Sequence, residues 1–450
     1  MTDPQIIWFR QDLRLNDQAA VVAAARAGPV IAVYVFDDKT PGDWRIGGAQ
    51  RWWLHHSLTA LAADLATHGV PLVLRRGRAG TVIPALVRDS GAGAVHALWH
   101  YEPWARVQQD EVASACELRL HDGNYLLPPG TVRTGSGGAF RIFTPFWRAL
   151  QQHMPPPEAA AVPALTAAPA PTGEALDDWQ LLPTTPDWSR GFDVWTPGEA
   201  GARAALDAFA GKAAGYDRAR NFPAEAGSSR LSPHLHFGEI SPAQVWHAVP
   251  DSDSYRREIA WRDFATGLID TFPDSHVTPG RAQFATFAHR DAPDELHAWQ
   301  HGRTGYPIVD AGMRELWATG WMHNRVRMIA ASFLVKHLLI DWRAGSRWFW
   351  DTLVDADLGN NSLGWQWIMG SGVDSSPFNR IFAPVTQSAK FEASAYIRKW
   401  VPELRAVSDA AIHAPWEAGG APGYPPPLVD HAEARARALA AYAGLRSVIA

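Results

Sequence analysis

The 450-residue sequence has very little cysteine and no long apolar run. Its single cysteine, Cys116, excludes an intramolecular disulfide framework and is typical of a protein of the reducing cytoplasm. We expect Cys116 to be an inert thiol. No stretch of 18 or more residues is apolar throughout, so we expect no membrane span. We also expect no secretory leader, because MTDPQIIWFR leads directly into a predicted strand.

Charge of either sign is also scarce, since 19% of the residues are charged and the net charge is −5. This balance argues against a protein that coats nucleic acid non-specifically. A local basic face on a mildly acidic protein can nevertheless bind DNA. Charge alone therefore does not decide whether nucleic acid is a partner.

The length predicts two domains. In residues 1–130, short apolar runs alternate with helical patterns, which predicts a parallel α/β sheet covered by helices. The runs are QIIWF, VIAVYVF, PLVLRR, AVHALWH and ELRLHD. No GxGxxG follows the first run, so the dinucleotide-binding fingerprint is missing.

Residues 131–197 are predicted to connect the two domains, because the chain becomes rich in Pro and Ala from about Gln151 onward. Residues 198–450 carry helical periodicity with almost no alternating pattern, which predicts an all-α domain. Its helices are expected at 201–219, 254–270, 308–320 and 326–342. We predict no metal site.

Tryptophan is abundant, and eight of the 22 fall within 69 residues. They are Trp299, Trp317, Trp321, Trp342, Trp348, Trp350, Trp365 and Trp367. A large helical core explains some of them, especially Trp317, Trp348 and Trp350. The mixture of Trp, Arg, Asn and Asp from 321 to 367 further indicates a large aromatic cofactor, a stacked apolar ligand and phosphates to be neutralised.

Several stretches resemble the cryptochrome/photolyase family, and in detail class I cyclobutane pyrimidine dimer photolyases. They are IIWFRQDLRLND, WMHNRVRM, DADLGNNS, GWQW and GYPPPLVDH, which together span nearly the whole chain. The resemblance implies a Rossmann-like α/β domain followed by an all-α FAD-binding domain. It also implies light-driven repair of UV-damaged DNA, in which reduced FAD donates an electron to a dimer flipped out of the duplex.

The resemblance assigns FAD contacts to several segments. The serines of GSSRLSPHLHFGEIS precede a helical pattern and can cradle a phosphate, although such serines are usually helix caps. Arg327 is expected to pair with Asp355, and the amide of Asn361 to face the reactive flavin nitrogen, where it cannot readily release a proton. The predicted FAD contacts are Tyr216, Ser228, Ser229, Arg230, Leu231, Ser232, Arg262, Trp321, Arg327, Asp355, Asp357 and Asn361.

The predicted lesion contacts occur at helical spacing in the sequence. Glu258, Trp261 and Arg262 share one helix face, and Trp321, Asn324 and Met328 share another, unless both are ordinary amphipathic helices. His323 is predicted to point away from the lesion. The resemblance makes Glu258, Asn324, Met328 and Asn361 catalytic, and Trp261 and Trp367 lesion-binding. It assigns the phosphates to Arg220, Arg325 and Arg380, although a single surface arginine is usually solvated.

Electron transfer to the flavin is assigned by the resemblance to Trp365 and Trp342. The outermost tryptophan of the family is replaced here by His289. Trp299, Trp348 or Trp350 are the candidate substitutes.

An antenna chromophore is expected in the α/β domain. Folate-binding members carry an Asn-Glu pair where this chain has Trp104 and Ala105. The EPWAR run is closer to members that hold a deazaflavin, which makes Arg51 a candidate contact and favours deazaflavin over folate. We expect a monomer.

Two other functions remain open. The first is a blue-light cryptochrome-type signalling receptor, against which the chain ends at Ala450, soon after the family core. The second is a flavin-dependent oxidoreductase, which would need a nicotinamide site that the sequence does not display.

Overall fold

The computed structural model describes residues 2–447 and divides into two compact units. Unit 1 comprises the residues up to Ser189, Asp193–Ala214 and Ser229–Pro273. Unit 2 comprises Arg190–Phe192, Gly215–Ser228 and the residues from Asp274 onward. The domain limits expected from the sequence stay a prediction.

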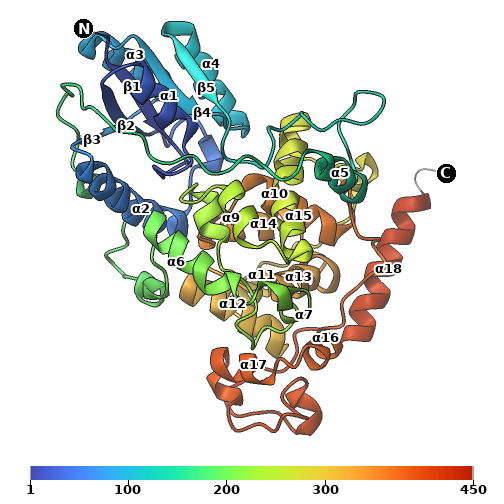
Figure 1. The fold of residues 1–450 in the computed structure, drawn as a ribbon. Coiled ribbons are helices and arrows are strands. Elements are labelled where there is room, and N and C mark those ends of the chain that lie inside the picture. Colours follow the sequence, from blue (N-terminus) through green and yellow to red (C-terminus); the bar gives the residue numbers. More distant parts are fainter. Residues whose placement is uncertain (1, 448–450) are drawn as a thin grey trace. The chain divides into compact units, whose positions relative to one another are not determined.

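Unit 1 contains a sheet of five parallel strands in the order β3-β2-β1-β4-β5 (Figure 1). The strands are β1 (Gln5–Phe9), β2 (Val30–Phe36), β3 (Leu72–Arg76), β4 (Ala94–Leu98) and β5 (Leu118–His121). Each falls on one of the five apolar runs, which confirms the predicted α/β sheet.

The sheet is buried on both faces, as expected for parallel strands covered by helices. Ile6 of β1 lies in register with Ile31 of β2 and with Val95 of β4, and all three side chains are buried. α3 (Ala79–Ser90) and α4 (Pro103–Ala115) contact each other and contribute side chains to this core. α1 (Ala19–Ala27) contacts β1 and β4.

The rest of unit 1 is helical or irregular. Between Gln151 and Pro197 the described chain contains only 3-10 turns and one isolated bridge, because its prolines and alanines support neither a long helix nor a central strand. The remaining helices are α2 (Gly48–Thr67), α5 (Phe143–Leu150), α6 (Glu199–Ala210), α8 (Ser232–His236), α9 (Pro242–Ala248) and α10 (Asp253–Thr271).

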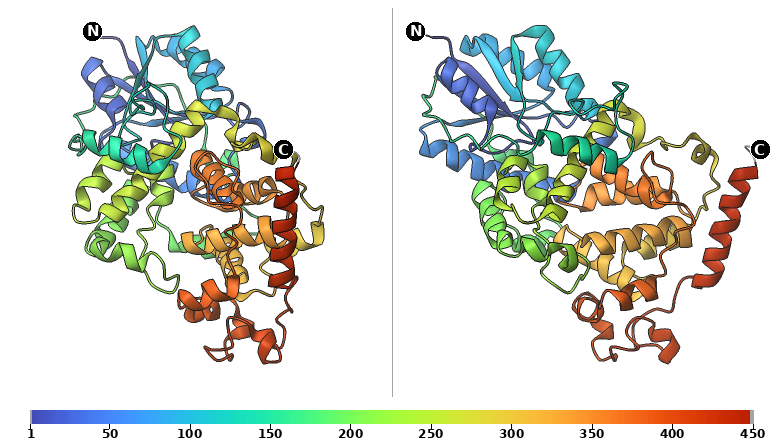
Figure 2. Two further views of the ribbon diagram at one scale, coloured as in Figure 1. Left: turned by 90° about the vertical axis from the view of Figure 1, so that its right-hand side faces the viewer. Right: turned by 45° about the vertical axis from the view of Figure 1, so that its right-hand side comes forward.

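The described part of unit 2 is built of helices that pack on one another, and those after Asp274 are drawn from yellow to red in Figure 2. Its α-helices are α7 (Tyr216–Ala219), α11 (Pro293–Gln300), α12 (Pro307–Thr319), α13 (Asn324–Ser332), α14 (Trp342–Thr352), α15 (Leu358–Met369), α16 (Pro384–Lys390), α17 (Ser394–Trp400) and α18 (His431–Ser447). This confirms the predicted helical second domain. Among the described residues, no helix is both long and apolar enough to cross a bilayer.

Short turns occur between these elements. The 3-10 turns are η1 (Gly42–Trp44), η2 (Gln151–His153), η3 (Leu176–Trp179), η4 (Ser189–Val194), η5 (Ala213–Gly215), η6 (Pro273–His276), η7 (Ala282–Thr286), η9 (Pro402–Leu404) and η10 (Pro415–Ala418). A π-helical turn, η8 (Phe333–His337), extends α13.

The helix predicted at 326–342 is wrong at its C-terminal end. It stops with η8 at His337, and Leu339 adopts a positive φ of 54°. A new helix, α14, begins at Trp342, where the Asp341 side chain accepts a hydrogen bond from the Arg343 amide at 2.9 Å. The break separates Trp342 from the lesion-side residues of α13.

Candidate functional site

The start of α15 presents two aspartates that serve different purposes. Asp357 caps the helix and accepts from the backbone and side-chain nitrogens of Asn360 at 2.7 and 2.9 Å. Asp355 Oδ2 pairs with Arg327 Nη2 at 2.8 Å, which confirms the predicted ion pair. Arg327 Nε donates to the Met322 carbonyl at 2.7 Å, so the guanidinium is held from two sides.

Buried polar atoms without a protein partner follow along α15. They are Asp355 Oδ1, Ser362 Oγ and Trp365 Nε1. Buried polar groups are nearly always hydrogen-bonded, so these three atoms are available to bind a polar ligand. Beside them, Asn361 Nδ2 donates to the carbonyl and the hydroxyl of Ser346 at 3.0 and 3.1 Å, which fixes the orientation of its amide. This donor and acceptor set fits a flat heteroaromatic ring such as that of FAD.

The two tryptophans assigned to electron transfer lie on adjacent helices. Trp365 belongs to α15 and Trp342 opens α14, and both are buried. A Cβ at Gly345, one turn after Trp342, would lie 2.1 Å from the Trp365 ring, so only glycine admits the indole. The sequence analysis missed Gly345, although a glycine among bulky helical residues was a signal of close packing.

His289 stands where the family has its outer tryptophan. Burial lowers the pKa of its imidazole, and Asp341 and Arg343 at the start of α14 act on it electrostatically. The imidazole is therefore neutral at pH 7.

Other tryptophans lie near this pair. The ring of Trp299 contacts that of Trp365 edge-on, with centroids 6.2 Å apart, and its Nε1 donates to the Ala330 carbonyl at 3.0 Å. Trp348 stacks on Trp317 with centroids 5.9 Å apart, and Trp317 is half exposed. Trp350 is buried.

α13 carries part of the predicted lesion face. His323 caps the helix by accepting a hydrogen bond from the Arg325 amide at 3.2 Å, and its orientation relative to a lesion stays a prediction. The helix begins at Asn324, and Trp321 therefore lies before it. The prediction that Trp321 shares a helical face with Asn324 and Met328 is wrong, because the helix starts only after its N-cap residue, His323.

Three arginines of unit 2 form a positive patch. Arg220 lies over the Tyr216 ring at 5.1 Å, Arg325 over Phe391 at 4.6 Å, and Arg380 over Trp367 at 5.6 Å. Burial and the charges of Arg220 and Arg380 lower the pKa of Arg325.

The same patch acts on His323. Burial, followed by Arg325, Arg327 and Arg220, lowers its pKa to about 4. Arg325 Nη1 also lies 3.9 Å from Met328 Sδ, at the predicted lesion face. These contacts bring the arginines close enough to act together on a polyanion.

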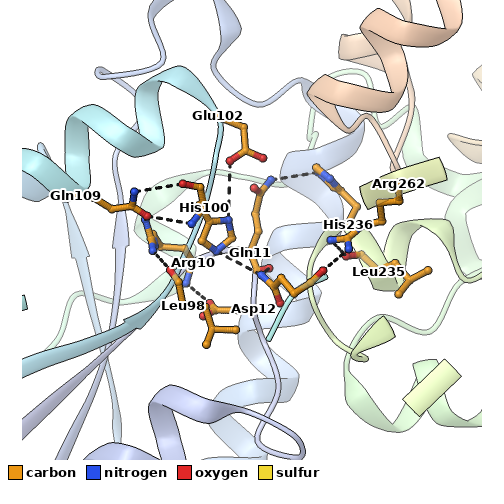
Figure 3. A network of polar contacts seen from close by, with 11 residues as sticks. Arg10, Gln11, Asp12, Leu98, His100, Glu102, Gln109, Leu235, His236 and Arg262 are labelled. Carbon is orange, nitrogen blue, oxygen red and sulfur yellow. Dashed lines mark hydrogen bonds and ion pairs between the residues drawn. The ribbon is translucent and has the colours of Figure 1, made fainter. Parts of the chain in front are cut away.

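In unit 1, α10 confirms that Glu258, Trp261 and Arg262 share one helix. Trp261 stacks on Phe143 of α5, with ring centroids 3.7 Å apart and planes 9° from parallel. Arg262 is turned inward, and its Nη2 donates to the Leu235 carbonyl at 3.1 Å (Figure 3). Its contact with FAD stays a prediction.

The serine-rich segment is held by its own side chains. Tyr255 donates to Ser229 Oγ at 2.7 Å, and Ser229 Oγ accepts from the amide of Leu231 at 3.2 Å. Arg230 adopts a φ of 57° and lies over the Trp195 ring at 4.4 Å. The N-cap residue of α8 is Leu231, which makes no side-chain capping bond. Ser228 belongs to unit 2, and Ser232 opens α8.

The ends of β1 and β4 carry a polar network that the sequence analysis missed (Figure 3). Arg10 Nη1 donates to Gln109 Oε1 at 3.1 Å, and Gln109 exchanges two hydrogen bonds with the backbone of His100. β1 and β4 are neighbours at the point where the strand order reverses, which is where open α/β sheets commonly bind ligands.

Arg51, the predicted antenna contact, lies on α2. Its Nε donates to the Ile46 carbonyl at 3.2 Å, and its guanidinium lies 5.7 Å from the centre of the Phe36 ring. Trp104 and Ala105 lie in the first turn of α4.

Comparison with known proteins identifies both parts of the chain. Residues 5–167 match the family model described as DNA photolyase, and residues 255–444 match the FAD binding domain of DNA photolyase. The deoxyribodipyrimidine photo-lyase of Agrobacterium fabrum is 47% identical over 99% of this chain and 98% of its own length. Cryptochrome-1 of Arabidopsis thaliana is 34% identical over 96% of this chain and 69% of its own length.

Solved structures agree with this assignment. A class III photolyase from Agrobacterium tumefaciens superposes with a TM-score of 0.94 at 46% identity, covering 99% of this chain and 98% of that one. The photolyase of Sulfolobus tokodaii, solved with two FAD molecules, superposes with a TM-score of 0.85 at 28% identity, covering 98% and 100%. The chain belongs to the DNA photolyase and cryptochrome family.

Proposed function

We propose that this chain is a deoxyribodipyrimidine photo-lyase that repairs cyclobutane pyrimidine dimers in UV-damaged DNA with light. The observation that carries the proposal is the α15 site, where the Asp355–Arg327 pair, the oriented amide of Asn361 and three orphaned buried atoms fit FAD. The 47% identical photo-lyase of Agrobacterium fabrum supports it.

When bound in its reduced form, FAD supplies an electron after absorbing blue or near-ultraviolet light. Asp355 Oδ1 would hold FAD by accepting a hydrogen bond, while Arg327 holds the other carboxylate oxygen. Asn361 would present its amide to the ring, and an amide does not readily release a proton. We assign phosphate and ribose contacts to Tyr216 and to the segment 228–232.

On the substrate side, Glu258 hydrogen-bonds the dimer, Trp261 and Trp367 give apolar contact, and Asn324 and Met328 line the lesion face of α13. Arg220, Arg325 and Arg380 grip the phosphates around the flipped nucleotides. Trp365 and Trp342 would pass electrons to FAD after its oxidation. Trp299, which contacts Trp365 and is fully buried, stays a candidate with Trp348 and Trp350 for the missing outer tryptophan.

The subtype proposed here is class III, in place of the class I expected from the sequence motifs. The support is the 46% identity and the TM-score of 0.94 to a structure described as a class III photolyase. Class I motifs alone did not separate the two subtypes.

We further propose an antenna chromophore in the α/β domain. The Sulfolobus tokodaii structure with two FAD molecules supports a second chromophore. A deazaflavin, with Arg51 as a contact, stays the prediction. The absorption spectrum of protein from its native host distinguishes a deazaflavin from a folate. We also expect the protein to be a cytoplasmic monomer.

The decisive experiment is repair of dimer-containing oligothymidine under blue light with a dark control. Loss of dimers in the light alone supports the photo-lyase. A cryptochrome-type receptor would bind FAD yet leave the dimers intact, and an oxidoreductase would consume a hydride donor in the dark.

A further inference from the structure

Unit 2 buries a lysine that has no acidic partner. Lys336 lies in the π-helical turn η8, and its side chain is 1% exposed. Within residues 2–447, no carboxylate lies within ion-pair distance of its Nζ. An ammonium removed from water is costly unless other dipoles replace the water. The groups that replace water around the Lys336 ammonium therefore show which part of the chain this lysine binds.

Three groups surround the ammonium. Lys336 Nζ donates to the carbonyl of Phe378 at 2.7 Å and to the carbonyl of Arg380 at 3.2 Å. It also lies 4.7 Å from the centre of the Phe378 ring, a cation–π distance. The Phe378 ring in turn stacks on Tyr442 of α18, with centroids 4.6 Å apart and planes 9° from parallel.

Both carbonyls belong to the loop that joins α15 to α16. Residues 370–383 contain no helix or strand, and the Arg380 amide closes a turn on the Pro377 carbonyl at 3.0 Å. Lys336 binds this turn on both sides of the exposed Asn379. Arg380 itself is exposed, and its guanidinium lies 5.6 Å from the centre of the Trp367 ring.

We propose that Lys336 is a positioning residue for DNA binding, which fixes the turn from which Arg380 reaches a phosphate. The inference rests on the proposed function, because it takes Arg380 as a phosphate contact. A loop residue that is free to move pays an ordering cost when it binds, and a turn that is already fixed avoids that cost. Burial and the charge of Arg380 lower the pKa of Lys336 to about 7, as expected for an ammonium without a counter-ion.

The rate of trypsin cleavage after Arg380 measures how firmly this turn is held, and the measurement needs no DNA. Cleavage after Arg380 requires its carbonyl, which Lys336 holds. In the FAD-loaded protein, Lys336→Met should speed cleavage of the Arg380–Ile381 bond roughly tenfold, the factor that a charge-assisted hydrogen bond represents. Cleavage after the exposed Arg405 serves as the internal reference and should not change.

The matched control is Lys399→Met. Lys399 also lies over an aromatic ring, at 4.8 Å from Trp400, but it is exposed. Trypsin should cleave the Lys399→Met variant after Arg380 at the wild-type rate. If Lys336→Met does not fold, Lys336→Gln keeps two N–H donors without the charge and should show a smaller acceleration. An unchanged rate after Arg380 in the variant that folds would overturn the proposal.

The DNA step is tested with a dimer-containing duplex oligonucleotide titrated with KCl. Arg380→Ala should lower the salt slope by about one unit. Lys336→Met should weaken DNA binding by about the same factor as Arg380→Ala. The double variant should bind DNA less than twofold more weakly than Arg380→Ala alone. Additive losses would overturn the proposal, because Lys336 would then act independently of Arg380.

The outcomes separate this inference from the proposed function. An unchanged slope in Arg380→Ala would remove the phosphate contact and the inference with it, whereas dimer repair by the wild type in light tests the photo-lyase activity by itself. Faster cleavage together with non-additive DNA losses supports the positioning role.

Discussion

Asp355→Asn tests the contact on which FAD binding depends. The substitution keeps the size of the side chain and removes the charge that pairs with Arg327 at 2.8 Å. Breaking a buried ion pair costs about 3–5 kcal/mol, and a hydrogen bond to a charged group is worth about 1.5–3 kcal/mol. Because Arg327 is partly open to solvent while Asp355 is buried, we expect about 2 kcal/mol of lost stability in the FAD-free chain.

FAD binding should be weakened as well as folding. An asparagine has one acceptor oxygen, which can serve either Arg327 or the cofactor, whereas the aspartate serves both. We therefore expect FAD affinity to fall at least about tenfold, as for a buried group left unpaired. Urea unfolding followed by tryptophan fluorescence measures the stability, and FAD titration measures the affinity.

Asp409→Asn is the control for this prediction. It removes an exposed ion pair with Arg398, and such pairs contribute about 0–1 kcal/mol. If Asp355→Asn and Asp409→Asn change stability and FAD affinity equally, the α15 site does not hold the cofactor.

Four further predictions concern other residues. Glu258→Ala should retain FAD but lower repair per absorbed photon roughly tenfold, since the dimer loses a hydrogen-bond partner; an unchanged yield removes Glu258 from the mechanism. Gly345→Ala should displace Trp365 and cost about 1–3 kcal/mol in urea unfolding, against a helix-propensity gain of about 1 kcal/mol; a more stable variant contradicts the close packing. Trp342→Phe should abolish most photoreduction of oxidised FAD, measured by absorption, and leave repair intact when the FAD is reduced chemically; photoreduction at the wild-type rate means that another route suffices. The pKa of Lys336 is lowered from 10.5 to about 7, so the unfolded chain binds more protons between these values, and unfolding should become harder as the pH rises from 7 to 10 in the wild type but not in Lys336→Met. Parallel pH dependence in the two proteins, measured by urea midpoints, contradicts that assignment.

The strands were predictable because each is a short run between helical patterns, and the runs of β1, β2 and β4 are largely apolar. Parallel strands buried on both faces lose the alternation of surface strands and read as continuous hydrophobic segments, as VIAVYVF does. Helices with clear periodicity, such as α10 and α12, were also found within one or two residues. The fold class follows from these local signals.

The helix predicted at 201–219 is wrong in its second half, since α6 ends at Ala210 and Tyr216–Ala219 form a separate short helix. The other two errors occurred where a local cap overrides periodicity. The apolar pattern from Val326 to Trp342 continues through the break, but Leu339 at positive φ and the cap by Asp341 end one helix and start another. Likewise, the cap at His323 leaves Trp321 outside α13. Side-chain caps compete with the backbone for hydrogen bonds, and an i, i+4 pattern does not register them.

Pair contacts were predictable only where a family resemblance assigned them. The Arg327–Asp355 pair lies 28 residues apart in sequence and was expected from the motifs alone. Lys336 and its two carbonyl acceptors are 42 and 44 residues apart. Backbone acceptors carry no residue identity, so no motif records this contact, and only the folded chain displays it.

The charge distribution reconciles a net charge of −5 with a polyanionic substrate. Burial, followed by the charges of Arg220 and Arg380, lowers the pKa of Arg325, so the three positive charges act on one another. A cluster of this kind is unfavourable in the free protein, and a phosphate backbone that neutralises it relieves the repulsion. If the proposed phosphate contacts are right, the local field at α13, rather than the total charge of the chain, should attract DNA. The arginines should raise the affinity and its salt dependence together, since both arise from the same counterion release.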